Sequence, residues 1–191
     1  MHFFKNLKTT LSSFAVIATI VLFTSSCEEL KDKTIQTVEV NPEPVDFVID
    51  SSSFNAQKAA NETVIVLDTM ISIDVAGVLE ENGFSIDNLS NGTLIEAELS
   101  TQFPEDAFSF MNGATLKIGN ESQEPAVVAQ VTNVNPESNS VMLETFDENL
   151  MQYIEQDPLH IILEIDANGP LPTNMMELSL DNIYEVEVEV L

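Results

Sequence analysis

The chain has 191 residues, a length that suits one domain of ordinary size with or without appendages. Its apolar fraction of 44% can supply a buried core, which excludes a wholly disordered chain. The chain has 32 acidic residues and only six basic ones, all of them lysine. A net charge of −26 without arginine argues against a nucleic-acid partner, because phosphates are neutralised by clustered lysine and arginine. The single cysteine excludes an intrachain disulfide and a cysteine-rich zinc site.

The first 26 residues have the layout of a secretory signal. Lys5 and Lys8 precede an apolar stretch over residues 11–23, which is shorter than the roughly 20 residues that a membrane-spanning helix needs. Small residues follow at 24–26, then Cys27, and all 32 acidic residues lie after this cysteine. The pattern predicts that residues 1–26 form a targeting segment that is removed.

The run Leu22-Phe23-Thr24-Ser25-Ser26-Cys27 resembles the signal peptidase II site of bacterial lipoprotein precursors, in the looser form found in Bacteroidota. The common pattern has Leu three residues before the cysteine, where this chain has Thr24. The resemblance implies that Cys27 is lipidated and becomes the mature N-terminus. An ordinary cleaved signal and a short membrane anchor are the alternatives. We expect an outer-membrane lipoprotein. The acids Glu28-Glu29 resemble a surface-export signal of Bacteroidota lipoproteins, which favours surface exposure, and a periplasm-facing anchor is the alternative.

Residues 27–44 are predicted to be a tether, because Pro42 and Pro44 cannot continue a helix or a central strand. A short edge strand over residues 37–40 is an option within it. Beyond residue 26 the chain keeps four lysines and all the acids, a formal charge of −28. Such a surface repels anionic membranes, so we expect membrane attachment to depend on the lipid.

From residue 45 to residue 191 the dominant pattern is strand alternation. Four of the six glycines follow asparagine, as is typical of tight turns, and Asn82-Gly83 can instead end a helical turn over residues 78–82. One better helix is predicted near residues 147–156, capped by Asp147 and stopped by Pro158. The predicted strands cover residues 45–50, 63–75, 93–101, 114–118, 126–134, 141–145, 159–167, 175–180 and 184–190.

Eight or nine short antiparallel strands with one short helix predict an all-β fold, a β-sandwich of the Greek-key or jelly-roll type. The runs 108–113 and 149–154 resemble parts of small β-sandwich domains in Bacteroidota lipoproteins, a likeness that assigns no activity. Alternation predicts that Glu98, Glu164 and Glu187 point outward. The residues predicted to point inward are Ile95, Leu99, Ile161, Leu163, Ile165, Val186 and Val188.

His160 is the only histidine after residue 26, so a Ser-His-Asp triad or a histidine metal cluster would have to include it. It shares the parity of Glu164, which predicts an outer-face histidine. No nucleophile-elbow, zincin or P-loop motif occurs in the chain. Adjacent acids at 28/29, 80/81 and 105/106 could supply a hydrolase with a carboxylate pair, yet with 32 acids such pairs arise by chance. We therefore expect no enzyme.

Calcium is the cofactor that an acidic chain can hold, since hard cations prefer carboxylate and carbonyl oxygens. Glu164-x-Asp166-x-Asn168-Gly169 resembles the first half of an EF-hand loop, but Glu164 stands where Asp should and Met175 stands at the twelfth position. Asp166 and Asn168 are thus weak calcium candidates, and no other cofactor or catalytic residue is expected. Carbohydrate binding would need an aromatic platform, and the chain has no tryptophan.

Together these observations favour a lipid-anchored cell-envelope protein whose non-catalytic β-sandwich is a binding or structural module. The alternative is a carbohydrate- or calcium-binding accessory or adhesion module of a surface uptake system. The expected partners are the membrane, through the lipid, and a protein or glycan that the sequence does not specify.

Overall fold

The computed structural model describes residues 34–52, 54, 63–102 and 107–190. Cys27 and the signal segment lie outside these residues. Two five-stranded sheets make up the described chain, and every strand pair in them is antiparallel. The predicted antiparallel β-sandwich is therefore confirmed.

Ten strands, two α-helices and a 3-10 turn are found in the described residues. The helices are α1 (Val75–Glu81) and α2 (Met151–Ile154), and the 3-10 turn is Ile86–Asn88. The first sheet holds β1 (Thr34–Val40), β2 (Val45–Asp50), β4 (Leu89–Thr101), β7 (Ser140–Met142) and β10 (Met175–Val190). The second sheet holds β3 (Thr63–Ile71), β5 (Met111–Asn120), β6 (Gln123–Val131), β8 (Glu144–Thr145) and β9 (Leu159–Ala167).

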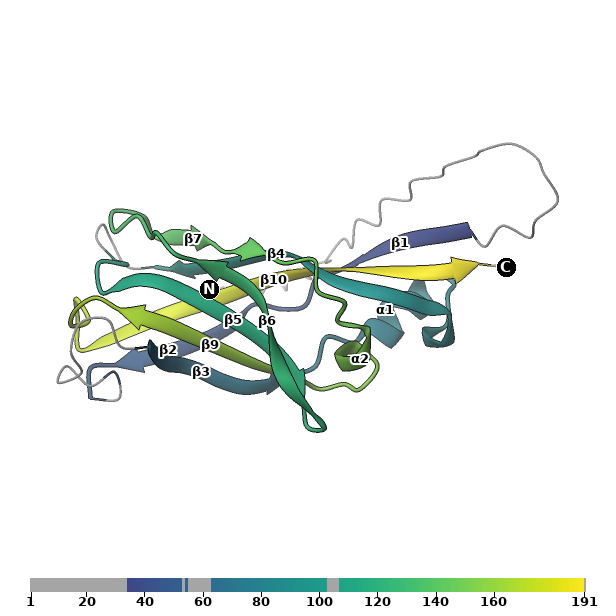
Figure 1. Ribbon diagram of the computed structural model, residues 1–191, viewed down its shortest axis with the longest axis horizontal. Helices are drawn as coiled ribbons and strands as arrows, with labels where there is room; N and C mark the ends of the chain where they lie inside the picture. Colours follow the sequence, from purple (N-terminus) through teal and green to yellow (C-terminus); the bar gives the residue numbers. More distant parts are fainter. Residues whose placement is uncertain (1–33, 53, 55–62, 103–106, 191) are drawn as a thin grey trace, which may run out of the picture.

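Strand β10 organises the first sheet and runs along the length of the molecule (Figure 1). One of its edges pairs with β4, and the other pairs first with β2 and then with β1. The sequence predicts two strands here, separated around residues 181–183, but Asn182 points inward and is 2% exposed, so one strand continues through it. Most successive strands lie in opposite sheets, which gives the jelly-roll-like crossing of the chain.

Residues 34–40 of the predicted tether form a strand instead, which confirms the short edge strand that the sequence allowed over residues 37–40 and extends it to residue 34. These residues form β1, which pairs in register from Thr34 opposite Val190 to Val40 opposite Tyr184. Val38 and Val40 are buried on the core face, 6% and 1% exposed. The two buried valines and the edge offered by β10 decide for a strand here, whereas Pro42 and Pro44 lie in the connection between β1 and β2.

The core lies between the two sheets, and the predicted inward face is confirmed at six of seven positions, each 0% exposed. Ile95 is the exception, at 40% exposed. Leu94 lies opposite Tyr184 and Glu96 opposite Ile183, so Ile95 has no counterpart in the ladder and forms a β-bulge that reverses the parity of β4. The acids predicted to point outward, at positions 98, 164 and 187, are partly exposed and alternate with buried neighbours.

Two of the four Asn-Gly pairs lie inside strands rather than in turns. A Cβ on Gly92 in β4 would lie 2.6 Å from Ile154 Cδ1, and one on Gly113 in β5 would lie 2.5 Å from the carbonyl oxygen of Val131. Gly92 thus admits a side chain of α2, and Gly113 admits the backbone of the neighbouring strand β6. Gly83 ends α1 with φ +82°, as predicted, and Asn168-Gly169 lies between β9 and β10.

The predicted helix at 147–156 is shorter than expected. Helix α2 spans Met151–Ile154, and the side chain of Asn149, not Asp147, accepts the Met151 N–H at 2.9 Å. Leu150, Tyr153 and Ile154 form its apolar face and are buried. The helical turn predicted at 78–82 is a second helix, α1, which begins after Asp74.

Candidate functional sites

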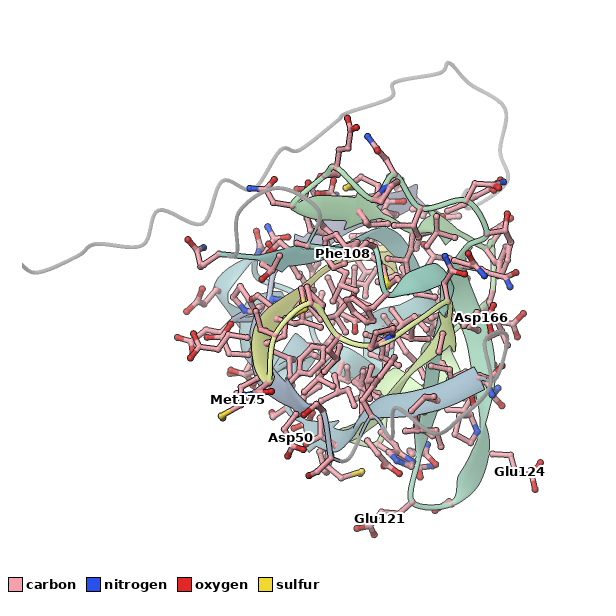
Figure 2. All side chains as sticks on the ribbon, turned by 90° about the vertical axis from the view of Figure 1, so that its left-hand side faces the viewer. Asp50, Phe108, Glu121, Glu124, Asp166 and Met175 are labelled. Carbon is pink, nitrogen blue, oxygen red and sulfur yellow. The ribbon has the colours of Figure 1, made fainter. Side chains whose placement is uncertain are left out.

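One end of the sandwich carries the beginning of the described chain and its C-terminal strand. Thr34 lies opposite Val190, and Figure 1 shows β1 beside the last part of β10 at this end. Strand β10 begins at the other end with Met175, which is 61% exposed. Sixteen residues of strand separate the two ends by about 50 Å. Figure 2 looks onto the far end, where Asp50, Phe108, Asp166 and Met175 are labelled.

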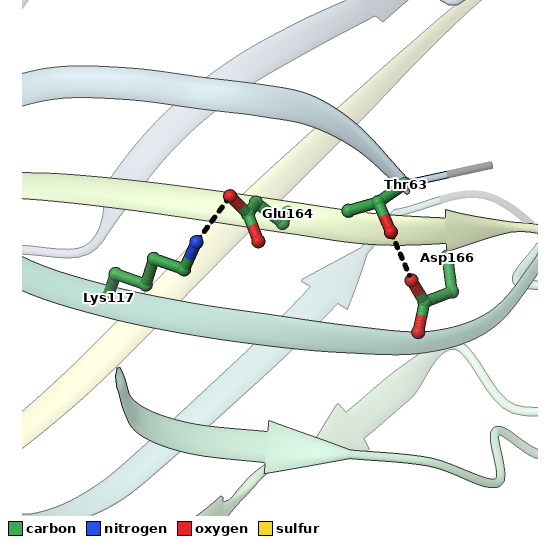
Figure 3. Close-up of polar contacts among 4 residues, drawn as sticks. All are labelled: Thr63, Lys117, Glu164 and Asp166. Atoms are coloured by element: carbon green, nitrogen blue, oxygen red, sulfur yellow. Dashed lines mark hydrogen bonds and ion pairs between the residues drawn. The ribbon is translucent and has the colours of Figure 1, made fainter. Parts of the chain in front are cut away.

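The candidate calcium ligands lie on β9 and just beyond it. Asp166 Oδ1 accepts a hydrogen bond from Thr63 Oγ1 at 2.8 Å, and Glu164 Oε1 lies 2.6 Å from Lys117 Nζ (Figure 3). The backbone N–H of Asn168 donates to the Phe110 carbonyl at 2.7 Å. These contacts bridge neighbouring strands. Within the described ranges, no group of three or more histidine, cysteine or acidic side chains could hold a metal ion.

His160 lies on the outer face of the second sheet, as predicted, with 27% of its side chain exposed. Its Nε2 lies 2.6 Å from Asp68 Oδ1 on the adjacent strand β3. Among the described side chains, no hydroxyl or thiol is hydrogen-bonded to His160. The pair thus links two strands and lacks the nucleophile that a Ser-His-Asp arrangement requires.

The outer face of the first sheet, which we name the acidic face, places like charges opposite each other. Glu39 lies opposite Glu185, and Glu98 lies opposite Asp181. Lys117, the single lysine in the described part of the chain, lies in the other sheet. Cross-strand pairs of like charge are destabilising. The acidic face comprises Glu39, Asp46, Asp50, Glu96, Glu98, Glu177, Asp181, Glu185, Glu187 and Glu189.

The sequence indicates only part of this face. The alternating acids at 185, 187 and 189 predict one solvated strand face. The pairing of Glu98 with Asp181 could not be read from the sequence, because the bulge at Ile95 sets the register between β4 and β10. Strand partners that are distant in the sequence bring the remaining acids together.

Two polar side chains of β10 point into the core. Asn182 Oδ1 and Tyr184 Oη are buried and have no hydrogen-bond partner among the described residues. Burial raises the pKa of Tyr184 well above its ordinary value of 10.0. Tyr153 and Tyr184 are 4% and 0% exposed, so both tyrosines lie in the core.

A groove beside β6 and β8 has a volume of about 280 Å³ and is bordered by Phe146, which is 40% exposed. Gln130, Asn133 and Glu144 supply polar groups along it. Phe146 is the most exposed aromatic side chain in the described part of the chain. The sequence contains no signal for it, because Phe in an alternating region is usually a core residue.

A second groove, of about 520 Å³, lies between residues 41–45 and the junction of β3 with α1. Asp157 accepts hydrogen bonds there from Ser72 Oγ at 2.5 Å and from the Ile73 N–H at 3.2 Å. Asp74 has φ 45°, a left-handed conformation that aspartate tolerates, and its side chain accepts the Gly77 N–H. These carboxylates hold the start of α1 in place.

Comparison with known proteins gives structural similarity alone. No family model matches the chain, and no curated protein does. Structures of the infectious bursal disease virus Gt and Gx strains match 96% of this chain. Each is 14% identical to it in sequence, and the TM-scores are 0.34 and 0.36. The chain spans 42% and 41% of the matched chains, less than half of their length. No helix in the part of the chain that the structure describes is long and apolar enough to cross a membrane.

Proposed function

We propose that the protein is an outer-membrane lipoprotein whose non-catalytic β-sandwich presents a binding or structural surface away from the membrane. The sequence context of Cys27 carries this proposal. Small residues precede this cysteine, the apolar stretch ends just before them, and the acids begin directly after it. Two or three acyl chains hold a protein on a membrane firmly, whereas one chain is marginal.

The arrangement of the strands supports a defined orientation. Thr34 is the seventh residue after Cys27, a distance of at most about 25 Å in extended chain. A lipid on Cys27 would therefore keep the β1 end near the membrane. The end with Asp50, Asp166 and Met175 would lie farther out by the length of β10 and would be open to partners (Figure 2). The strand-bridging role of His160 supports the non-catalytic part of the proposal.

Replacing the cysteine tests the proposal. Wild-type protein should take up labelled fatty acid and sediment with outer membranes after a high-salt wash, while Cys27→Ser should do neither. A Cys27→Ser protein that stays with washed membranes would overturn the proposal. Protease added to intact cells separates the two orientations: degradation indicates surface display, and protection indicates a periplasm-facing anchor.

The exposed Phe146 favours one alternative, a carbohydrate-binding accessory role at the β6–β8 groove. An exposed aromatic ring beside amide and carboxylate groups can stack on a sugar and hydrogen-bond its hydroxyls. If this role holds, Phe146→Ala should abolish retention of the purified protein on an immobilised polysaccharide that the wild type binds. Met70→Ala, at a similarly exposed apolar residue of β3 outside the groove, is the matched control and should retain binding.

A further inference from the structure

Four Asn-Gly sequences in the chain offer the same chemistry in different surroundings. In such a pair the glycine backbone nitrogen, once deprotonated, can attack the asparagine side-chain carbonyl carbon. A new C–N bond forms, the bond from Cγ to Nδ2 breaks, and ammonia leaves with the proton it takes up. Water then opens the cyclic imide at either carbonyl to give aspartate or isoaspartate. The reaction consumes one water, releases one ammonia and needs no oxidant or reductant.

Two of the four pairs are held in strands. Asn91-Gly92 lies in β4, where Gly92 is paired opposite Val186 and covered by Ile154. Asn112-Gly113 lies in β5, where Gly113 is buried against the backbone of Val131. Extended backbone keeps the nitrogen away from the side-chain carbonyl, and ring closure needs local opening of the sheet first.

The pair at the end of α1 is held by hydrogen bonds. Asn82 Nδ2 donates to the Val78 carbonyl at 2.8 Å, which ties the side-chain amide back onto the helix. The N–H of Gly83 donates to the Glu80 carbonyl at 3.0 Å. Both reacting groups are therefore engaged, although this pair lies at the surface.

The fourth pair, Asn168-Gly169, lies in the connection between β9 and β10, and its reacting groups are neither held in a strand nor tied back by hydrogen bonds to other described residues. Asn168 is exposed, and a Cβ built on Gly169 meets no heavy atom within 4 Å. The Gly169 N–H donates to no hydrogen-bond acceptor within the described ranges. The Asn168 N–H donates to the Phe110 carbonyl, whereas in the described part of the chain no hydrogen bond holds the Asn168 side-chain amide.

We infer that Asn168 is a self-modification site, where the folded protein converts asparagine to aspartate and isoaspartate through attack by the Gly169 nitrogen. The modification adds a carboxylate two residues after Asp166, which Figure 2 labels at the far end of the sandwich. Isoaspartate also adds one backbone carbon to the turn that joins the two sheets.

The test compares the four sites within one molecule. Purified folded protein is incubated at mildly alkaline pH, digested, and mapped by mass spectrometry for the replacement of an amide by an acid. We expect conversion at Asn168 to be about tenfold or more faster than at positions 91 and 112, which wait for local opening. Peptides digested before incubation are the control, and in them all four sites should react at similar rates.

Gly169→Ala is the matched variant, because the position accepts a methyl group and the change hinders attack by the nitrogen. It should suppress conversion at Asn168 and leave the melting temperature unchanged. The inference is overturned if folded protein converts Asn168 no faster than the strand sites, or if Gly169→Ala leaves its rate unchanged.

Discussion

At the scale of single residues, glycines with the same sequence signature have opposite structural roles. A methyl group on Gly113 would overlap the carbonyl oxygen of Val131, whereas one on Gly169 meets nothing within 4 Å. We predict that Gly113→Ala lowers the free energy of unfolding by about 1–3 kcal/mol, since the backbone must shift to admit it. Gly169→Ala should change it little. Urea unfolding of both variants checks this, and equal losses would contradict the packing described for β5 and β6.

Tyr184 gives a second prediction at this scale. Its hydroxyl is buried without a partner among the described residues, so Tyr184→Phe should raise the free energy of unfolding by about 1 kcal/mol at neutral pH. The check is chemical denaturation of both proteins. A clear loss of stability in the variant would show that the hydroxyl has a partner.

The same residue predicts a pH dependence. Because burial raises the pKa of Tyr184, the folded state keeps its proton at pH values where the unfolded chain, with an ordinary pKa of 10.0, has lost it. The unfolded state then binds fewer protons, so stability falls as pH rises above about 10. The free energy of unfolding of Tyr184→Phe should fall less steeply between pH 9 and pH 11 than that of the wild type. Parallel curves for the two proteins would contradict the burial of this side chain.

At the scale of elements, alternation predicts strands well where both faces follow it, as in β9 and the second half of β10. It fails where pairing with a distant strand decides the outcome. Ile95 is exposed because of a bulge between β4 and β10, and β1 is a strand because β10 offers it an edge. Local composition around residues 34–40 carries no information about that edge.

The acidic face supplies the prediction for elements. Glu185 lies opposite Glu39, so Glu185→Gln should raise the free energy of unfolding by about 0.2–1 kcal/mol through loss of like-charge repulsion. Glu164→Gln is the matched control and should lower stability, because it removes the partner of Lys117. Thermal melts of both variants at low salt test these two predictions. A lower melting temperature for Glu185→Gln than for the wild type would contradict repulsion between Glu39 on β1 and Glu185 on β10.

At the scale of the whole molecule, the formal charge of −28 beyond residue 26 sets the response to salt. Moderate neutral salt should raise the melting temperature, because it screens the repulsion among exposed acids, most strongly between those farther apart than the Debye length of about 10 Å at 0.1 M. The rise in melting temperature with salt should be smaller in Glu185→Gln, because this variant lacks the repulsion between Glu185 and Glu39. A melting temperature that stays flat or falls as sodium chloride is added would contradict the effect of the acidic face.

The candidate sites were less predictable than the fold. Asp166 and Asn168 could be selected as oxygen ligands, but their bonds to Thr63 and Phe110 depend on strand pairing and a turn. Phe146 carried no sequence signal as an exposed residue. The lipid site is the opposite case: the residues around Cys27 predict it, and they lie outside the described part of the fold.

The mass of the mature N-terminal fragment tests the lipoprotein proposal most directly. Protein extracted from membranes is cleaved, and the fragment that ends before β1 is analysed by mass spectrometry. The proposal predicts a fragment that begins at Cys27 and carries diacylglycerol on Sγ, with residues 1–26 absent. A mature chain that begins elsewhere, or an unmodified Cys27, would contradict the lipid anchor and the orientation of the sandwich built on it.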